Sequence, residues 1–175
     1  MYIMGIDPTT GQTSAQGPAF RVGSMGAVVE APSLYTAPMS SSGSTAGAFE
    51  GPKVVVYVSA GAGITAGQAV QIDYLSEATP TGALASSTGY RVGVATCDID
   101  SGGYGWVQVH GRAEVNVVAS TVVGGAVSTS GTAGSLDDLT AGAGLRPVTG
   151  LHIGAVNGTV AQAFLNWPVQ GAAFS

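Results

Sequence analysis

The sequence predicts an all-β protein: a compact β-barrel or β-sandwich-like core built from two similar β units, with an extended N-terminal arm. From Val54 to Phe164, runs of β-branched and aromatic residues alternate with turns that contain glycine, which is the pattern of successive short strands. No long stretch free of glycine shows helical periodicity, and the most helix-permissive piece, residues 136–139, is one turn at most. The 28 glycines and the aromatic content of 7% also indicate a turn-rich chain with small side chains.

The N-terminal part, residues 1–52, is expected to form the arm, with a Pro/Ser/Gly-rich loop and one short strand. Pro32, Pro38 and the run Ser40–Gly47 disfavour a helix, and residues 20–31 are expected to contain the strand. Segments that stay disordered seldom contain so many large apolar residues, so the sequence favours an arm that becomes ordered on neighbouring subunits over a disordered leader. The residues expected to bind the partner are Phe20, Val28, Val29, Leu34, Tyr35 and Met39.

Residues 53–175 are expected to form the all-β core. The segment Val54–Val58 is a continuous run of β-branched and aromatic residues followed by glycine, which is typical of a strand. Gln68–Tyr74 alternates apolar and polar residues with period two, as a half-buried strand does. Tyr90–Cys97 and Trp106–His110 are expected to be the third and fourth strands of this unit.

The pattern then restarts and predicts an internal repeat of residues 54–112 and 113–168. Short motifs follow in the same order in both halves, beginning with Val115–Val117, which resembles Val56–Val58. Shared composition is the alternative explanation, but several matches in one order favour a duplication. The other matched segments are Gly124–Val127 with Gly67–Val70, Gly134–Leu136 with Gly82–Leu84, Ile153–Val156 with Val92–Ala95, and Thr159–Leu165 with Gly105–Val109.

The sequence predicts the local structure at three places. Asn157-Gly158 tolerates the positive φ angles of a type I′ turn and is expected to close a two-residue hairpin. Pro168 cannot donate a hydrogen bond to a ladder, so the last strand is expected to end there. Trp106 and Trp167 would occupy equivalent ends of the two units, and both are expected to fill the core.

The low charge of the chain predicts protein partners and argues against nucleic acid. Only 9% of the residues are charged, and the net charge is −5, whereas about 25% is usual for globular proteins. Small side chains bury little apolar area, which contributes about 25 cal/mol per Å², so we expect an oligomer. The basic residues are too scattered to neutralise a phosphate backbone; they are Arg21, Lys53, Arg91, Arg112 and Arg146.

Three motifs resemble ligand sites, and each is better explained as a turn or loop. The glycine-rich segment Gly61–Gly67 leads into a strand, so no helix N-terminus would meet a phosphate. The segment Asp98–Gly103 begins like a calcium loop, but Tyr104 and Trp106 stand where further oxygen ligands would be needed. Asp137-Asp138 has no partner base and is expected to lie in a solvated loop.

The remaining reactive residues do not form a recognisable site. Two histidines, His110 and His152, and one cysteine, Cys97, cannot make up a zinc site of nitrogen and sulfur ligands. Cys97 lies in an apolar run and is expected to be a buried, inert thiol. The residue counts do not exclude a Ser-His-Asp catalytic arrangement, although no Gly-x-Ser-x-Gly motif is present. We therefore expect no catalytic, cofactor-binding or metal-binding residues and no enzyme activity.

The N-terminus lacks the basic start and the apolar stretch of a signal peptide. No apolar window is long enough for a membrane span. The sequence thus predicts a protein that is made in the cytoplasm and resides there or in an assembled particle.

The segments Val56–Val70, Gly105–Val117 and Phe164–Pro168 resemble small head proteins of tailed bacteriophages, cyanophages and other aquatic podophages included. The resemblance covers residues 54–168. It implies a capsid cement or decoration protein that binds the major capsid protein on the outside of the phage head, commonly as a homotrimer with extended terminal arms. It brings no catalytic residues. The stretch Ala31–Pro52 departs from the family pattern.

Three alternatives follow from the same residues. A tail, fibre or head-spike protein of a phage would share the glycine-rich β repeats. A carbohydrate-binding β module would present Trp106, Tyr104 and Tyr90 as an exposed platform, so burial of Trp106 would exclude that site. A small hydrolase acting on the host wall would need a carboxylate pair, which the chain does not supply.

Overall fold

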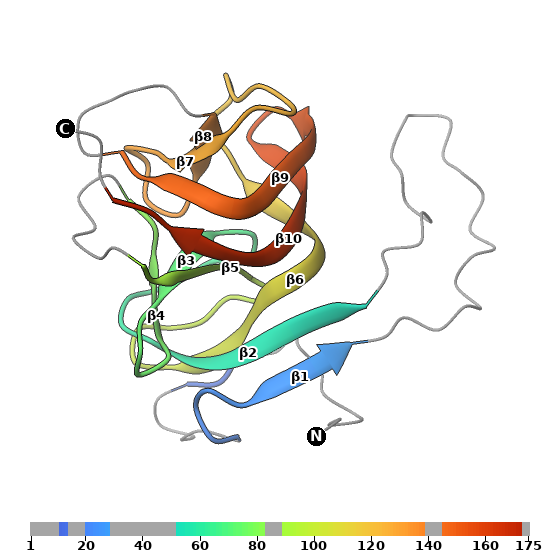
Figure 1. Cartoon of the computed structure of the whole chain (residues 1–175). Coiled ribbons are helices and arrows are strands. Elements are labelled where there is room, and N and C mark those ends of the chain that lie inside the picture. Colours follow the sequence, from blue (N-terminus) through green and yellow to red (C-terminus); the bar gives the residue numbers. More distant parts are fainter. Residues whose placement is uncertain (1–10, 14–19, 29–51, 83–88, 139–144, 173–175) are drawn as a thin grey trace.

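The structure, a computed structural model, describes residues 11–13, 20–28, 52–82, 89–138 and 145–172. In this part of the chain it contains ten strands and no helix (Figure 1), so the predicted all-β class is confirmed. The strands in chain order are β1 (Met25–Val28), β2 (Lys53–Ala60), β3 (Ala69–Ile72), β4 (Glu77–Pro80), β5 (Arg91–Ala95), β6 (Tyr104–Asn116), β7 (Val127–Thr129), β8 (Leu136–Asp138), β9 (Pro147–Asn157) and β10 (Val160–Gln170).

Five of the described strands close into a first ring. β2 pairs in parallel with β4, and β4–β3, β3–β5, β5–β6 and β6–β2 are antiparallel. Closure leaves these strands without a long free edge, which protects a β protein from unwanted pairing. The interior is filled by small and branched side chains; they include Val56, Val58, Val70, Ile72, Val107 and Val109.

A second ring repeats this pairing order with the later strands. The C-terminal half of β6 pairs with β10, β10 with β9, β9 with β7 and β7 with β8, all antiparallel. The ring closes where Val117 forms a parallel bridge with Leu136 and the Val118 amide donates to the Leu136 carbonyl at 2.9 Å. Its interior contains Val115, Val127, Leu136, Ile153 and Leu165, all buried.

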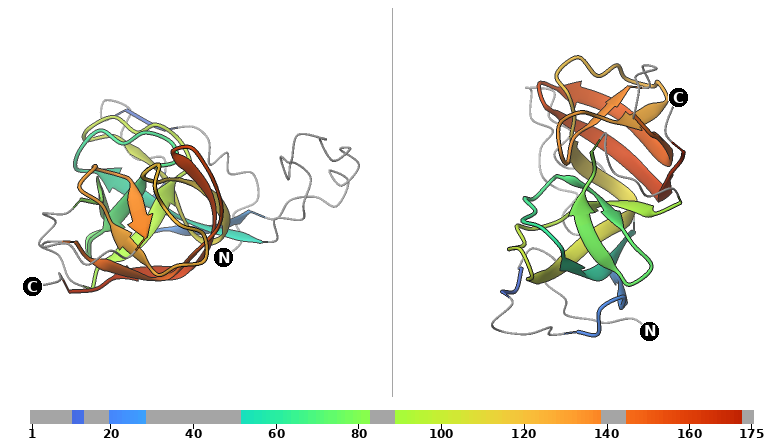
Figure 2. Two further views of the ribbon diagram at one scale, coloured as in Figure 1. Left: turned by 90° about the horizontal axis from the view of Figure 1, so that it is seen from above. Right: turned by 90° about the vertical axis from the view of Figure 1, so that its left-hand side faces the viewer.

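The two rings are stacked and share β6. Figure 2 shows β6 running from the ring of β2–β5 into the ring of β7–β10. The strand crosses at Gly111, whose φ of 92° is open to glycine and strained for other residues. A Cβ at this position would also lie 2.6 Å from the Pro52 carbonyl oxygen. The glycine therefore lets one strand serve both rings without a break.

The pairing relates each residue of one ring to a counterpart in the other. Ala60 pairs in parallel with Ala78 of β4, and Val117 pairs in parallel with Leu136 of β8. Val117 is thus the counterpart of Ala60 and lies two residues from the expected match with Val58. A shift of two keeps each side chain on the same face of its strand.

Left-handed backbone positions recur in both rings at nearly constant spacing. Two of the positions, Ser76 and Trp167, are not glycine. Beyond Trp167, β10 reaches back to the first ring, where Val169 pairs with Arg91 of β5. The turns before β3 and β7, the turns before β4 and β8, the hairpins before β6 and β10, and the crossing points of β6 and β10 therefore have similar backbone conformations. The pairs are Gly67 with Gly124, Ser76 with Gly134, Gly102 with Gly158, and Gly111 with Trp167.

The local predictions for the end of the chain are confirmed in part. A two-residue hairpin joins β9 to β10 as predicted, but Asn157 pairs with Val160, so the loop residues are Gly158 and Thr159. Gly158 has a φ of 63° and Asn157 has no positive φ, so the type I′ turn centred on Asn157-Gly158 is wrong. Pro168 does not end the last strand, because β10 continues to Gln170 and the pairing with β9 shifts between Leu165 and Val169. A proline is tolerated at such an irregularity, where no ladder N–H is needed. The helix-permissive residues 136–138 form β8 instead.

The strand expected within residues 20–31 is β1, and it pairs with β2 of the same chain. Met25 lies opposite Val56 and Val28 opposite Lys53. Figure 1 shows β1 along the lower edge of the first ring. Residues 29–51, which connect β1 to β2, lie outside the described residues.

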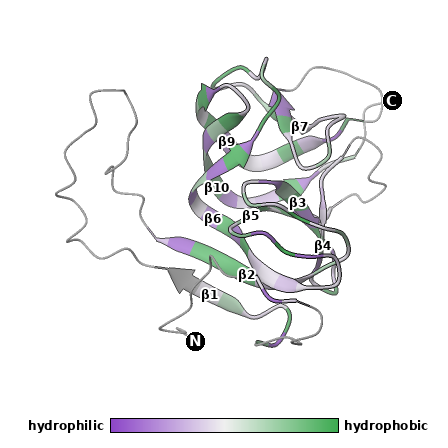
Figure 3. Ribbon diagram, turned by 180° about the vertical axis from the view of Figure 1, so that it is seen from behind, coloured by the Kyte–Doolittle hydropathy of each residue, from purple (hydrophilic) through white to green (hydrophobic). Residues whose placement is uncertain are grey.

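The strands of the two rings differ in how they are covered, and Figure 3 colours them by residue hydropathy. β2 is coloured hydrophobic over most of its length, and its residues Val55–Val58 are buried on both faces. In β9, by contrast, buried residues alternate with exposed ones. A strand that is buried on both faces is covered on its outer side, whereas alternation indicates an open outer face.

Candidate interaction surfaces

The residues considered for catalysis or metal binding do not come together in the structure. Cys97 is buried, as predicted. His110 is half-buried in β6, and His152 is exposed in β9. Across the described ranges, no group of three or more His, Cys, Asp or Glu residues could hold a metal ion. No segment that the structure describes forms a helix that could span a membrane.

The Asp98–Gly103 segment is a braced turn. One Asp98 carboxylate oxygen accepts a hydrogen bond from the Ala66 amide at 2.8 Å. The Gly103 amide donates to the Asp100 carbonyl at 2.8 Å, and Ile64 bridges Ile99. These bonds tie the glycine-rich segment to the β5–β6 hairpin, in agreement with the prediction of a turn.

Asp137 and Asp138 form part of β8, and Asp137 holds the loop that precedes β7 against this strand. The Thr121 hydroxyl donates to Asp137 Oδ1 at 3.2 Å, and the Asp138 amide donates to the same oxygen at 2.9 Å. Burial raises the pKa of the Asp137 carboxyl above its ordinary value, and a side-chain hydrogen bond with Asp138 acts in the same direction. These hydrogen bonds give the pair a structural role, which is to fix the position of the Thr121 loop on β8.

A buried aromatic cluster covers the outer face of the first ring. Tyr57 and Trp106 are 1% and 2% exposed and lie opposite each other on β2 and β6. Phe20 packs on both, with ring centroids 5.5 Å from Tyr57 and 5.3 Å from Trp106. Phe20, a residue expected to bind a partner, therefore contacts its own chain. Burial of Trp106 also excludes the carbohydrate platform of Trp106, Tyr104 and Tyr90.

The other expected partner-binding residues belong to the segment between β1 and β2. Val28 is the last residue of β1 and pairs with Lys53 at the start of β2. Val29, Leu34, Tyr35 and Met39 lie outside the described residues. The pair Val28–Lys53 thus marks where this segment leaves the ring and where it returns.

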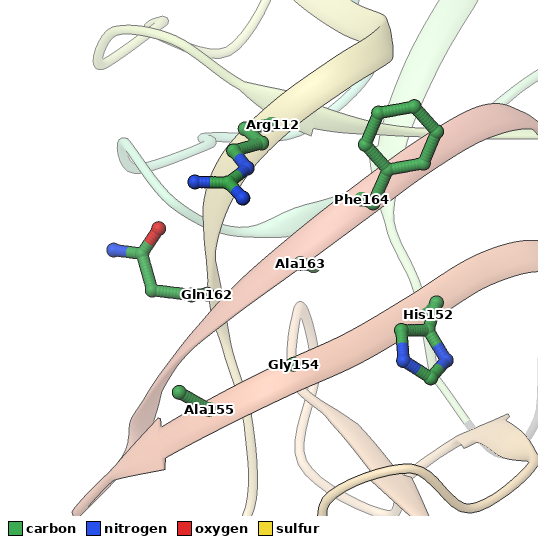
Figure 4. Close-up of a pocket in the computed structure, with 7 residues that line it drawn as sticks. All are labelled: Arg112, His152, Gly154, Ala155, Gln162, Ala163 and Phe164. Atoms are coloured by element: carbon green, nitrogen blue, oxygen red, sulfur yellow. The ribbon is translucent and has the colours of Figure 1, made fainter. Parts of the chain in front are cut away.

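The outer face of the second ring carries an open hollow of about 440 Å³. Figure 4 shows its lining side chains on β6, β9 and β10. Gly154, Ala155 and Ala163 leave space at its floor. Arg112, His152, Gln162 and Phe164 surround that space.

This hollow adjoins the place that corresponds to the aromatic cluster of the first ring and shares Gln162 with it. Tyr57 pairs with Trp106 between β2 and β6, and Glu114 pairs with Gln162 between β6 and β10. In the second ring the pair is polar: Gln162 Nε2 donates to Glu114 Oε1 at 2.8 Å. No residue that the structure describes covers the Glu114 side chain, which is exposed.

A second aromatic group lies beside the hollow and is exposed. The His110 ring stacks on Trp167 at 6.2 Å and meets Phe164 edge-on at 5.8 Å. Phe164 is 46% and Trp167 is 41% exposed, so the prediction that Trp167 fills the core is wrong. The left-handed φ of 52° at Trp167, at the irregular part of β10, replaces the regular alternation that the prediction assumed.

The turn between β3 and β4 presents the two most exposed large apolar side chains of the described residues. Tyr74 is 84% and Leu75 is 66% exposed. Asp73 Oδ1 accepts from the Leu75 and Glu77 amides, each at 2.8 Å, and the Ser76 amide donates to the Asp73 carbonyl. These bonds hold the turn in one conformation. We call residues 73–77 the apolar turn.

The sequence did not predict the hollow or the apolar turn. Tyr74 was placed at the end of an alternating strand, whereas β3 ends at Ile72. Asp73 followed by Ser76 was the available signal, because an aspartate at the first position of a turn often accepts bonds from the next amides. No comparable signal existed for the hollow, since its lining residues come from three strands.

No protein-family model matches this chain, and no curated protein matches it. The resemblance to phage head proteins therefore stays a prediction from three motifs. In the structure these motifs form much of β2, β6 and β10, the strands that build both rings.

Proposed function

We propose that this chain is a structural protein of a virus particle. It would be a capsid cement or decoration protein that binds the outside of a tailed-bacteriophage head and stabilises contacts between major capsid proteins. A homotrimer on the virion surface, made in the host cytoplasm, is part of this proposal. The observation that carries it is the pairing of Val28 with Lys53, the strand residues on either side of this segment of the sequence.

The closed rings favour a segment of this kind as the binding element. Strands that pair within a ring have few backbone groups left for a neighbouring protein. A segment that leaves one paired strand and returns to the next can extend over a neighbour without disturbing the core. Its sequence supplies apolar side chains for burial; they are Val29, Leu34, Tyr35 and Met39.

The energetics fit repeated weak binding to a symmetric shell. An ordinary protein interface buries about 800 Å² on each partner, which a segment of this length can supply. Copies that associate with one another would bind neighbouring capsid subunits together, and linked contacts gain affinity through effective concentration. The low content of charged residues, 9%, is in keeping with a surface that is largely covered by protein.

Binding to empty heads tests this proposal. Purified chain is mixed with expanded heads that lack it, and bound protein is measured after sedimentation of the heads. Replacing Val29, Leu34, Tyr35 and Met39 by serine should abolish binding while the β circular-dichroism spectrum is kept. The matched control replaces Ser40, Ser41, Ser42 and Ser44 by alanine and should bind normally. Undiminished binding by the first variant would contradict the proposed role of the segment.

A tail, fibre or head-spike protein is the structural alternative. The copy number per particle separates the two, because a shell protein is present in hundreds of copies and a tail protein in few. Quantitative mass spectrometry of purified particles, referenced to the major capsid protein, measures this ratio. A ratio near that of a tail component would overturn the assignment to the shell.

A further inference from the structure

The second ring has an open face where the first ring has a covered one. In the first ring, Phe20 and Val22 pack on Val55, Tyr57 and Trp106. Beside the corresponding place of the second ring, the Glu114–Gln162 pair, lies the hollow that Figure 4 shows. The fold thus contains two similar outer faces, and residues of the chain itself fill only one of them within the described ranges.

The hollow is suited to an apolar group flanked by negative charge. Its floor consists of Gly154, Ala155 and Ala163, beside the Phe164 ring. Arg112 and His152 stand at its rim, and neither forms an ion pair within the described part of the chain. A volume of about 440 Å³ falls within the range of about 300–1,000 Å³ that is usual for ligand pockets.

The apolar turn has the complementary character. Tyr74 and Leu75 project from it and are more exposed than any other large apolar residue that the structure describes. Two carboxylates belong to the same turn: Asp73 Oδ1 caps the Leu75 and Glu77 amides, and the exposed Glu77 places its carboxylate beside Gly61. Because hydrogen bonds already fix the turn, docking would cost little conformational entropy.

We propose that the apolar turn of one copy docks into the second-ring hollow of the next copy. Tyr74 and Leu75 enter the space above the small residues, beside Phe164. The carboxylates of Asp73 and Glu77 then approach Arg112 and His152. The occupant of the hollow is therefore a second copy of this chain.

The contact is between copies because the turn does not enter the hollow of its own molecule. The turn belongs to the first ring and the hollow to the second, and Tyr74 is 84% exposed in the single chain. Such a contact joins unlike surfaces, so it produces a closed ring of copies if the rotation closes, and an open chain if it does not. It goes beyond the proposed binding to capsids and involves different residues.

Paired variants test this contact in solution, in the absence of heads. The turn variant is Tyr74→Ala with Leu75→Ala, and the hollow variant is Ala155→Glu, which places a carboxylate against those of the turn. Sedimentation at increasing concentration should show that each variant alone associates at least about tenfold more weakly than the wild type, as loss of a central anchor does. The control changes Val122 and Val123, which are exposed elsewhere, to alanine and should leave association unchanged.

Mixing the two variants gives the sharper result. The hollow variant keeps an intact turn and the turn variant keeps an intact hollow, so the mixture should form heterodimers and nothing larger. Association of the turn variant at wild-type strength would overturn the proposal, and so would a mixture that stays monomeric.

Cysteine pairing gives an independent measurement. Under mild oxidation, Leu75→Cys chains mixed with Ala155→Cys chains should form a disulfide-linked heterodimer, while Leu75→Cys mixed with Val122→Cys should not. The native Cys97 is buried and does not interfere. Linkage of Leu75→Cys chains to one another at the same rate would indicate a symmetric contact and overturn the proposal. Failure here would leave binding to heads untouched, and loss of binding to heads would leave this contact untouched.

Discussion

The two rings pair their strands in the same order but present opposite outer faces. The first ring carries Tyr57 opposite Trp106, and Phe20 covers both. The second ring carries Glu114 opposite Gln162 at the corresponding place, and this pair is open to solvent. Backbone pairing thus determines the ring, whereas the side chains on its outer face determine whether that face serves stability or binding.

The difference follows from the physics of burial. Aromatic side chains stabilise a fold strongly when they are removed from water, so the first face requires a cover. A hydrogen-bonded polar pair at the surface gains little from burial and remains open at no cost. A protein with two similar rings can therefore stabilise itself through one outer face and bind through the other.

The largest expected effect on stability comes from substitution of Trp106, compared with its counterpart Gln162 in the second ring. Trp106→Ala should destabilise the protein by about 3–5 kcal/mol, as for other buried aromatic residues, because Tyr57 and Phe20 both lose a partner. The counterpart Gln162→Ala should change the stability by less than about 0.5 kcal/mol. Urea unfolding followed by circular dichroism measures both. Equal losses at the two positions would show that the outer faces are energetically alike.

The crossing points of the two rings allow a second comparison. Gly111→Ala should cost about 1–3 kcal/mol, the usual penalty for a strained backbone conformation, since φ is 92° and a Cβ would meet the Pro52 carbonyl. At the corresponding Trp167, glycine should relieve strain and lose the contact with His110, so the net change should stay within about 1 kcal/mol. Thermal unfolding provides the measurement. A neutral Gly111→Ala would mean that β6 does not need its left-handed residue.

Removal of the cover on the first ring should have a moderate effect. Phe20→Ala loses two aromatic contacts and should cost about 1–2 kcal/mol, given about 0.5–1.5 kcal/mol for such a pair beyond its buried area. The substitution should also make the fluorescence of Trp106 easier to quench with acrylamide. The matched control is Phe164→Ala in the second ring, where the ring is already 46% exposed. If the control were the more destabilising of the two, the assignment of the covered face would be wrong.

The smallest expected effect concerns Asp137 in β8. The pKa of its carboxyl is raised by burial, so the folded state holds the proton more tightly than the unfolded state. Stability from this group is present at low pH and is lost as the pH rises through the raised folded value. Asp137→Asn keeps an acceptor for Thr121 and should stabilise the protein at neutral pH by less than about 0.5 kcal/mol.

The pH dependence of that variant gives the check. Unfolding free energies of the wild type and Asp137→Asn should converge as the pH falls below the ordinary aspartate range and separate at neutral pH. The corresponding residue of the first ring, Thr79, does not titrate, and Thr79→Ser should give no such pH dependence. A difference that instead widened toward low pH would contradict the direction of the pKa shift.

Local chemistry made much of the fold predictable. The β-branched run Val54–Val58, the alternation after Gln68 and the glycine of the β9–β10 hairpin all act within a few residues, and the structure has a strand or a tight turn at each place. The burial of Cys97 followed from its apolar neighbours. The sequence did not indicate that the two expected repeat units share a strand: the boundary expected between residues 112 and 113 lies within β6, which continues through Gly111.

The interaction surfaces were not predictable in the same way. Phe20 is an apolar residue in a glycine-rich stretch, and nothing local to it indicates that Tyr57 and Trp106 lie beneath it. Trp167 looked like a core residue because the sequence does not show the shift in the pairing of β10 with β9 between Leu165 and Val169, where Trp167 lies. The hollow depends on the register between strands.

The amino-acid order on its own determined the β class, the positions of most strands and the small, weakly charged character of the chain, because these depend on propensity and short-range spacing. Only the tertiary structure decided how the strands close into two rings, which outer face is covered and where the hollow and the apolar turn lie. Those features depend on contacts between segments far apart in the chain, and side-chain periodicity cannot specify which strand becomes a neighbour.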